Sequence, residues 1–218
     1  MKVNIHYYCA ALEQENFSTG LVLTRNYATL LANVPPWKLC TYNQRSRTMS
    51  ENLTGSLIIQ AVKESGVKTV LTVPDKTTAD GLLRPIAADA DLRHVRTCKE
   101  DETIGISAAL SYSGHRSLIL IQYTGLLYSM NAIRAVAVEY QTPICLMVGL
   151  LGKEPGVLPT ESKRFGVKII EPILDTMGIV HHVIETDDDI EKISPAINNA
   201  YETSSPVAML IGRPPLAS

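Results

Sequence analysis

The sequence lacks the signals of several classes of protein. Its 218 residues carry 20 Lys and Arg against 22 Asp and Glu, so it has no positive excess with which to attract the phosphates of a nucleic acid. Its most apolar region, residues 117–151, is interrupted by Arg134 and Glu139, so we expect no membrane span. Glu13 and Glu15 stand where the apolar core of a secretory signal would have to run, so we expect no export signal.

The four cysteines, Cys9, Cys40, Cys98 and Cys145, form no CxxC or other paired spacing. Metal sites and redox pairs usually show such a spacing, so isolated cysteines are typical of reduced, buried thiols. Reduced thiols persist in reducing compartments. We therefore expect a cytoplasmic protein that binds neither nucleic acid nor membrane.

Residues 1–48 differ in pattern from the rest of the chain. They contain Pro35, Pro36 and the only tryptophan, Trp37, and a regular apolar rhythm begins only after Met49. We interpret residues 1–48 as an N-terminal extension of unknown role, either an ordered arm or an upstream stretch whose natural start is Met49. Residues 49–218 are long enough for one domain with a single core.

From Leu53 onward, short apolar runs alternate with helical patterns. Runs such as SLILIQ and PICLMVG are apolar on both faces of a strand, which is typical of a parallel sheet between helix layers. The sequence therefore predicts an α/β fold, a three-layer parallel sheet with helices on both faces. The expected strands are Lys68–Val73, Leu92–Thr97, Ser117–Gln122, Pro143–Gly149, Val180–Ile184 and Pro206–Ile211. The first expected helix begins after its N-cap Thr54 and stops at Gly66, and the second passes through Leu82, Leu83 and Ile86. The other expected helices cover Asp101–Ser113, Gly125–Tyr140, Val167–Met177 and Asp188–Thr203.

Three of the expected turns lie at the carboxyl ends of strands, where α/β sheets bind their ligands. These turns are Val73–Asp75, Cys98–Glu100 and Gln122–Gly125. No GxGxxG follows the first strand, and no GxxxxGK followed by Ser or Thr occurs, so neither a dinucleotide fingerprint nor a P-loop is present.

Three acidic residues, Glu100, Asp101 and Glu102, open the helix that follows the second strand. Acidic side chains stabilise helix N-termini because they bind unpaired N–H groups and favour the helix dipole, so capping alone explains them. A carboxyl at the carboxyl edge of a sheet is also a candidate acid or base. The residues by themselves leave both interpretations open.

Four ordered blocks give the sequence a resemblance to a known family. The blocks are VPDKTTADGLLRPI, CKEDETIGISAAL, IQYTGLLYSMNAI, and MVGLLGKEPG followed by TESKRFGVKIIEPILDTMGI. They resemble the pyrimidine-binding domain of thiamine-diphosphate-dependent enzymes, above all phosphonopyruvate decarboxylase and the alpha subunit of sulfopyruvate decarboxylase. The resemblance extends from about Leu53 to Pro214. It implies a subunit of an enzyme that decarboxylates a small 2-oxoacid.

The resemblance implies that Glu100 is the catalytic residue. In this family a glutamate between the second strand and its helix bonds to N1′ of the aminopyrimidine, and the apolar helix 104–108 aligns that glutamate with Glu100. A carboxyl that shares a proton with N1′ stabilises the imino tautomer, which is the internal base of the cofactor. Asp101 and Glu102 are then capping neighbours.

The resemblance also implies contacts from two further turns. In the first, Pro74 backs the cofactor and Asp75 lies near the substrate, although an ordinary Pro-Asp turn explains the same residues equally well. In the second, QYTGLLYSMN, Gly125 faces the pyrimidine, while Tyr123 and Tyr128 replace smaller or amide residues and so change the pocket lining. The implied cofactor-binding residues are Pro74, Glu100, Gln122, Thr124, Gly125 and Tyr128.

The stretch 149–166 is rich in Gly and Pro and lies between a strand and a helix, which is typical of an active-site lid. Its cations, Lys153, Lys163 and Arg164, are candidates to bind an anionic group of the substrate. The arginine that the family carries before the loop glycine is Leu151 here, so a phosphonate or sulfonate site does not transfer directly. With Asp75, these three cations are the implied substrate-binding residues.

The sequence lacks the Gly-Asp-Gly segment that, with a later Asn-Asn pair, binds magnesium diphosphate in this family. The resemblance therefore implies a hetero-oligomer in which a beta-type partner chain carries that motif and supplies the Mg²⁺ ligands for thiamine diphosphate. His181 and His182 have no third ligand at a useful spacing, so we expect no metal-binding residue in this chain. Two alternatives stay open: a carboligase half-site of the acetolactate-synthase type, or a non-catalytic binding or scaffold module.

Overall fold

The computed structural model describes residues 51–217. The predicted N-terminal extension, residues 1–48, and the alternative start at Met49 lie outside the described residues, as do Cys9 and Cys40. The described chain is built around one sheet.

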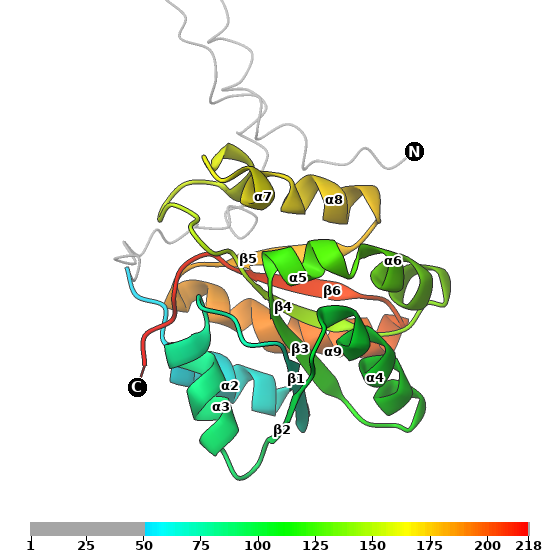
Figure 1. Ribbon diagram of the computed structural model, residues 1–218. Coiled ribbons are helices and arrows are strands. Elements are labelled where there is room, and N and C mark those ends of the chain that lie inside the picture. Colours follow the sequence, from blue (N-terminus) through cyan, green and yellow to red (C-terminus); the bar gives the residue numbers. More distant parts are fainter. Residues whose placement is uncertain (1–50, 218) are drawn as a thin grey trace, which may run out of the picture. The chain divides into compact units, whose positions relative to one another are not determined.

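The sheet has six strands in the order β2-β1-β3-β4-β6-β5, and every neighbouring pair is parallel (Figure 1). Each strand falls within a segment that the sequence assigns to a strand. The prediction of an α/β fold with a parallel sheet between helix layers is therefore confirmed. The strands are β1 (Thr69–Thr72), β2 (Arg93–Arg96), β3 (Ser117–Gln122), β4 (Cys145–Gly149), β5 (Val180–Ile184) and β6 (Val207–Ile211).

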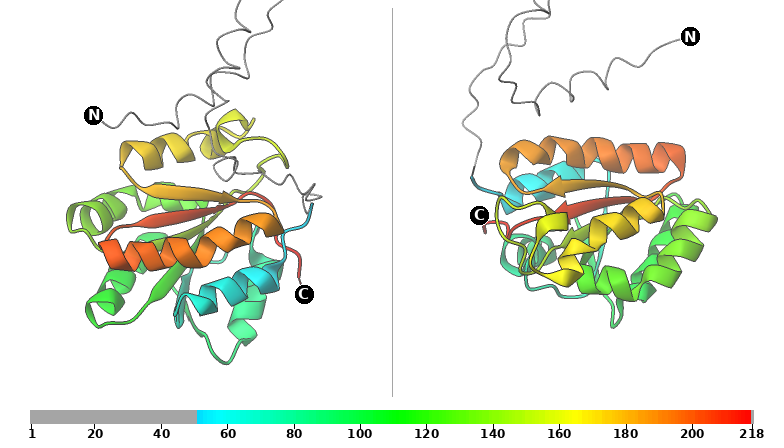
Figure 2. Two further views of the ribbon diagram at one scale, coloured as in Figure 1. Left: turned by 180° about the vertical axis from the view of Figure 1, so that it is seen from behind. Right: turned by 90° about the horizontal axis from the view of Figure 1, so that it is seen from above.

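Helices cover both faces of the sheet because alternate strand residues point in opposite directions. Val70 and Leu118 pack against α2, α3 and α9, whereas Leu71 and Ile119 pack against α4, α5 and the helices that follow them. Figure 2 shows α9 on one side of the sheet and α7 with α8 on the other. The helices are α2 (Gly55–Glu64), η3 (Ala79–Leu83), α3 (Arg84–Ala88), α4 (Glu100–Tyr112), α5 (Tyr123–Tyr128), α6 (Met130–Ala132), η4 (Ile133–Glu139), η5 (Pro159–Glu161), α7 (Phe165–Lys168), α8 (Ile170–Thr176), η6 (Asp187–Lys192) and α9 (Ile193–Thr203).

Four expected helices are interrupted in the structure, and the one through Leu82 and Ile86 is divided into the π-helical η3 and α3. The segment predicted over 125–140 is divided into α5, α6 and the wider π-helical η4, and it breaks at Ser129, whose N–H bonds to both Gly125 and Leu126. The segment over 167–177 is divided into α7 and α8, and the last one opens with the 3₁₀ turn η6. Apolar periodicity does not distinguish these turn types, since all of them keep one face on the core.

Thr54 is the N-cap of α2, as predicted, but its side chain does not cap the helix. Its hydroxyl instead donates to Asp187 Oδ2 at 3.0 Å, and its backbone N–H donates to Asp187 Oδ1 at 2.6 Å. A tertiary partner therefore replaces the local capping bond. Gly66 follows the helix with φ of 81°, the left-handed conformation that favours glycine, so the predicted stop is confirmed.

The strand order places a ligand-binding edge beside β1 and β3. The chain leaves β1 for the outer strand β2 and returns to β3 on the other side of β1, which makes a topological switch point at their carboxyl ends. In the next pair, Gln122 at the end of β3 is in register with Gly149 at the end of β4. The turns that follow β1, β2, β3 and β4 therefore meet at one edge.

The two ends of the described chain also meet at the carboxyl edge. Leu216 accepts a hydrogen bond from Gly55 N–H at 3.0 Å and donates one to Leu53 at 2.7 Å. A Cβ atom on Gly81 would lie 2.2 Å from the carbonyl oxygen of Pro215, so the tail packs directly on η3. The tail that follows β6 thus crosses the start of α2.

Candidate active site

The turn after β3, Gln122 to Gly125, is the centre of the candidate site. Gln122 ends β3, and Tyr123 begins α5. Three of its residues contact three other segments at this edge of the sheet, where the strands have their carboxyl ends. Gly125 contacts the start of α4, Gln122 contacts the turn after β1, and Tyr123 contacts the start of α7.

Glu100 lies directly against Gly125. A Cβ atom built on Gly125 would be 2.3 Å from Glu100 Cγ and 2.7 Å from Glu100 Oε1, so any side chain at position 125 would displace the carboxyl group. Glu100 is the first residue of α4 and is half-buried. Its carboxylate makes no hydrogen bond or ion pair within residues 51–217, although its backbone carbonyl accepts one from Thr103.

Its two acidic neighbours behave differently. Glu102 caps α4, since its Oε2 accepts the backbone N–H groups of Cys98 at 3.2 Å and Lys99 at 3.3 Å. Asp101 Oδ1 is buried and has no hydrogen-bond partner in the part of the chain that the structure describes. Capping therefore explains Glu102 but leaves Glu100 unexplained.

Asp75 lies below the surface of the site, with 3% of its area exposed. Its carboxylate accepts hydrogen bonds from the backbone N–H groups of Thr77 and Thr78, from the Thr78 hydroxyl, and from Gln122 Nε2 at 2.9 Å. A Cβ atom on Gly149 would lie 2.2 Å from Asp75 Oδ2. Asp75 therefore joins the turns after β1, β3 and β4 from inside.

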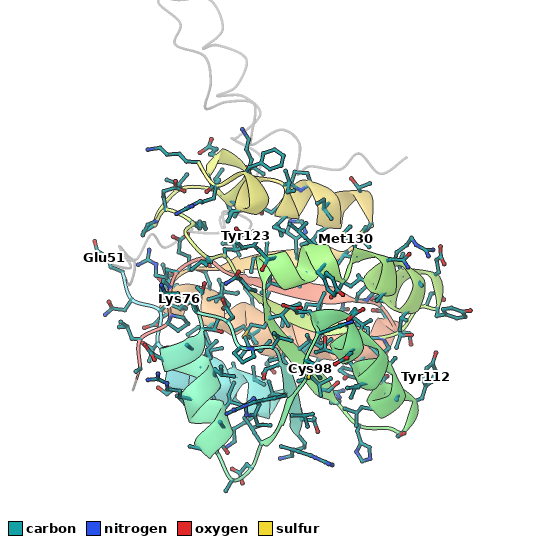
Figure 3. The ribbon with its side chains drawn as sticks, in the orientation of Figure 1. Glu51, Lys76, Cys98, Tyr112, Tyr123 and Met130 are labelled. Carbon is teal, nitrogen blue, oxygen red and sulfur yellow. The ribbon has the colours of Figure 1, made fainter. Side chains whose placement is uncertain are left out.

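The other predicted cofactor-binding residues are at the surface of this edge. Pro74, Thr124 and Tyr128 are exposed, and Thr124 donates to Gln122 Oε1 at 2.9 Å. Because Asp75 and Thr124 both bind the amide of Gln122, its orientation is fixed. Cys98 is an exposed thiol in the turn that leads to Glu100 (Figure 3).

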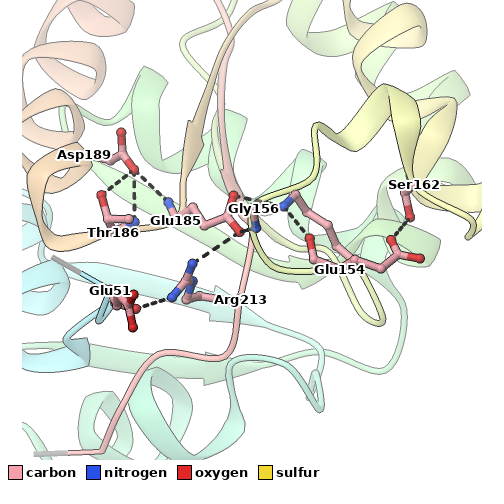
Figure 4. A network of polar contacts seen from close by, with 9 residues as sticks. Glu51, Glu154, Gly156, Ser162, Glu185, Thr186, Asp189 and Arg213 are labelled. Carbon is pink, nitrogen blue, oxygen red and sulfur yellow. Dashed lines mark hydrogen bonds and ion pairs between the residues drawn. The ribbon is translucent and has the colours of Figure 1, made fainter. Parts of the chain in front are cut away.

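The predicted lid is held by a buried ion pair at its first turn. The Lys153 side chain has no exposed area, and its Nζ donates to Glu185 Oε2 at 2.9 Å and to the carbonyl of Glu154 at 3.0 Å. Glu185, which follows β5, also accepts the N–H of Gly156 at 2.8 Å and lies 3.5 Å from Arg213 Nη2 (Figure 4). Lys153 is thus occupied by an internal partner.

Glu154 holds the two sides of the lid together. Its Oε2 accepts the Ser162 hydroxyl at 2.8 Å, and its Oε1 accepts the N–H of Lys163 at 3.3 Å. The bond from Ser162 is the main reason that the pKa of the Glu154 carboxyl lies below its usual value. Ser162 in turn accepts the N–H of Arg164 at 3.1 Å. The lid is therefore a closed, internally bonded loop.

The second side of the lid presents its cations to solvent. Lys163 and Arg164 are exposed. Arg164 folds back over the first side, since its Nε would lie 2.8 Å from a Cβ atom on Gly152. Two residues later, a Cβ atom on Gly166 would lie 2.5 Å from Cε2 of the Tyr123 ring.

His181, for which the sequence predicts no metal role, has a contact within the fold, since its Nδ1 lies 3.2 Å from the carbonyl oxygen of Ile179. Within residues 51–217, no three His, Cys, Asp or Glu side chains are grouped so that they could hold a metal ion. None of the helices in the same residues is long and apolar enough to cross a bilayer.

Sequence reasoning missed two contacts of this edge. One is the bond between Glu185, which follows β5, and Lys153. The position of Glu185 at the carboxyl end of a predicted strand was the only hint in the sequence that it lies at this edge. The other is the packing of Tyr123 on Gly166, which no spacing predicts because the two residues are brought together only by the fold.

A pocket of about 580 Å³ lies elsewhere, between α2 and α3, and Lys63 and Asp89 are among the residues that line it.

The sheet order and a glutamate at the start of α4 that faces a glycine after β3 are the features expected of a pyrimidine-binding domain. The chain is similar to curated proteins named sulfopyruvate decarboxylase subunit alpha. It is 29% identical to that of Methanocaldococcus jannaschii over 160 residues, which is 72% of this chain and 93% of the relative. It is 28% identical to that of Methanococcus maripaludis over 71% of this chain and 91% of the relative.

A longer relative and the family comparison complete these findings. A Methanosarcina acetivorans protein named sulfopyruvate decarboxylase is 22% identical over 154 residues, which is 71% of this chain and 38% of that protein. No family model matches the chain. The resemblance that the sequence blocks indicate, to sulfopyruvate decarboxylase alpha subunits, is therefore confirmed.

Proposed function

We propose that the chain is the alpha-type subunit of a thiamine-diphosphate-dependent 2-oxoacid decarboxylase and that Glu100 is its catalytic residue. The observation that carries this proposal is the carboxylate of Glu100, which rests against Gly125 and has no bonding partner in residues 51–217. This leaves the carboxylate available to a ligand, and a ligand nitrogen that shares a proton with it is a suitable partner.

The residues at the edge fit an aminopyrimidine ring. The side chain of Glu100, in the first turn of α4, lies against Gly125, which offers backbone rather than a side chain beside it. When it is bound, thiamine diphosphate supplies the electron sink that lets carbon dioxide leave a 2-oxoacid. The role of Glu100 is to hold and return a proton at N1′, and Gln122 and Thr124 form one wall of the ring site.

Asp75 is proposed as a positioning residue. Its carboxylate is buried and accepts four hydrogen bonds from this chain, so it fixes the amide of Gln122 rather than meeting the substrate. Pro74 and Tyr128 are exposed and are proposed to line the cofactor site.

The substrate is proposed to be a small 2-oxoacid with a second anionic group. Two exposed cations, Lys163 and Arg164, stand at the end of the lid, whereas Lys153 is buried with Glu185. Arg164 Nε comes close to Gly152, next to Leu151, where the family carries an arginine. A guanidinium supplied from the other side of the lid is suited to bind a sulfonate, phosphonate or carboxylate.

The Mg²⁺-diphosphate half of the site is proposed to come from a beta-type partner chain. The given sequence has no Gly-Asp-Gly motif, and its relatives of similar length are named as alpha subunits. The M. acetivorans protein is named as a whole decarboxylase, and this chain matches 38% of it. The names of the relatives support an enzyme in which the two halves of the site lie on different subunits.

Calorimetric titration of thiamine diphosphate with Mg²⁺ tests the proposal, first on the full chain alone and then on its complex with a co-expressed beta-type chain. We expect tight binding only to the complex, followed by release of carbon dioxide and an aldehyde from sulfopyruvate, phosphonopyruvate or pyruvate. An acyloin product would identify a carboligase instead. A stable complex that binds no cofactor would favour the scaffold alternative.

A further inference from the structure

Tyr123 makes the contact that joins the lid to the cofactor turn. Its half-buried ring fills the space that a side chain at position 166 would need, at 2.5 Å from Cε2, 3.2 Å from Cζ and 3.3 Å from Oη (Figure 3). Gly166 does not adopt a left-handed φ, unlike Gly152. Glycine is therefore needed at 166 for space and not for backbone conformation.

The lid's other anchors hold it to a different part of the edge. Lys153 and Gly156 bind Glu185 after β5, and Glu154 closes the loop on itself through Ser162. These bonds do not reach the turn after β3. Gly166 is only two positions after Arg164, so the ring of Tyr123 fixes how far the lid's cationic end lies from Gly125 and Glu100.

We propose that Tyr123 is a positioning residue that sets substrate specificity by holding Lys163 and Arg164 at a fixed distance from the reacting centre. The proposal rests on the function proposed above and adds the residue that enforces recognition of the second anionic group. Binding by a guanidinium depends on geometry, and a displacement of about 1 Å can cost up to about a hundredfold in rate. Substrates without that group, such as pyruvate, do not use the contact.

Two substitutions disturb the contact from opposite sides. Gly166→Ala adds a methyl group where the ring lies, and Tyr123→Ala removes the ring. In the complex, each variant raises KM for the substrate with a second anionic group about tenfold more than it raises KM for pyruvate, because only the first substrate uses the cations. Because both act on one contact, the double variant shows the same tenfold loss rather than a hundredfold loss.

Two variants serve as controls. Tyr123→Phe keeps the ring and makes KM values like those of the wild type. Gly105→Ala is a matched glycine substitution, since nothing lies within 4 Å of a Cβ atom there. Equal KM changes for both substrates, or additive losses in the double variant, would overturn the positioning role.

Limited trypsin digestion of the full chain alone gives a readout that needs no activity. The bonds after Lys163 and Arg164 are expected to be cut several times faster in Gly166→Ala and Tyr123→Ala than in the wild type, while cutting after the exposed Lys76 stays the same. Unchanged cutting at the lid would refute the anchor itself. If the anchor is present but the wild-type complex decarboxylates no 2-oxoacid, the proposed function fails and the specificity role falls with it.

Discussion

Two helical segments in this chain begin with three acidic residues, and the structure treats them differently. In η6, Asp187 binds the N–H and hydroxyl of Thr54, and Asp189 accepts the N–H groups of Glu185 and Thr186. In α4, Glu102 does the capping, while Glu100 lies unbonded against Gly125 within residues 51–217.

The difference separates a structural acid from a candidate catalytic one. Both segments have the same sequence pattern, and capping with a favourable dipole interaction is sufficient for η6. At α4, one acid is enough for the cap, and the strand order places the first acid at the switch point. Position in the fold, rather than the pattern, distinguishes the two.

The largest expected effect comes from Glu100→Gln, which removes the proton-sharing carboxyl and keeps the shape. We expect decarboxylation by the complex to fall by about 10²–10⁴-fold, as for loss of an acid–base group. The melting temperature should not fall, because Glu100 makes no side-chain bond in the described chain. Full activity in this variant would mean that Glu100 is not catalytic and that the acidic residues of α4 and η6 do not differ in function.

Gly125→Ala sharpens the same contrast without changing an acid. Its methyl group would lie 2.3 Å from Glu100 Cγ, so the carboxyl has to move. We expect kcat to fall at least about tenfold, since catalytic groups tolerate little displacement, with KM for the cofactor also raised. Steady-state kinetics beside Gly105→Ala provides the comparison, and equal behaviour of the two variants would argue against the contact.

At η6 the expected effect is on stability. Burial alone would raise the pKa of Asp189, but bonds from Lys192 and from the N–H groups of Glu185 and Thr186 outweigh it and hold the pKa below its usual value. Loss of such a cap costs about 0.5–2 kcal/mol, so Asp189→Ala should lower the free energy of unfolding at pH 7 by about 1 kcal/mol and leave activity unchanged.

The pH dependence of that variant follows from the direction of the shift. A carboxyl whose pKa is lower in the folded state stabilises the fold above its unfolded pKa and loses that contribution as the pH falls through the folded pKa. The stability difference between wild type and Asp189→Ala should therefore shrink below about pH 4. Urea denaturation at pH 7 and at low pH measures it, and a constant difference would contradict the assignment.

The smallest effect expected is a difference in labelling. Cys98 is exposed beside the start of α4, whereas burial raises the pKa of the Cys145 thiol to about 12. Since the thiolate is the reactive form, N-ethylmaleimide should label Cys98 and spare Cys145 in the native chain. Peptide mass mapping checks this, and binding of the partner chain should slow the labelling of Cys98.

Much of the fold could be predicted from the sequence because the four inner strands, β1, β3, β4 and β6, are short, buried and mostly apolar runs, whereas the edge strands β2 and β5 carry His or Arg beside Val. The six strands and the stop at Gly66 follow from local pattern. The breaks at Ser129 and within residues 167–177 could not be predicted, since 3₁₀, α and π turns bury the same face. The bond of Thr54 to Asp187 was beyond local rules because 133 positions separate the two residues.

The candidate site could be predicted only in part. A glutamate after the second strand and a glycine after the third are visible in sequence, and the fold brings them into contact. Lys153 illustrates the limit: its charge suggested a substrate contact, yet its side chain lies buried on Glu185. The partner of a charged side chain depends on which strands end next to each other in the sheet. That strand order cannot be predicted from any single segment of the sequence.

The position of the tail after β6 affects how a tag or linker can be attached to the chain. Leu216 is hydrogen-bonded to Leu53 and Gly55, and Pro215 packs on Gly81, so a peptide attached beyond residue 217 emerges at the carboxyl edge. A bulky C-terminal tag would crowd the edge on which the proposed partner chain would close. A linker of suitable length from the same point could instead join this chain to the proposed partner as one polypeptide, with the local concentration of the partner set by the linker's reach.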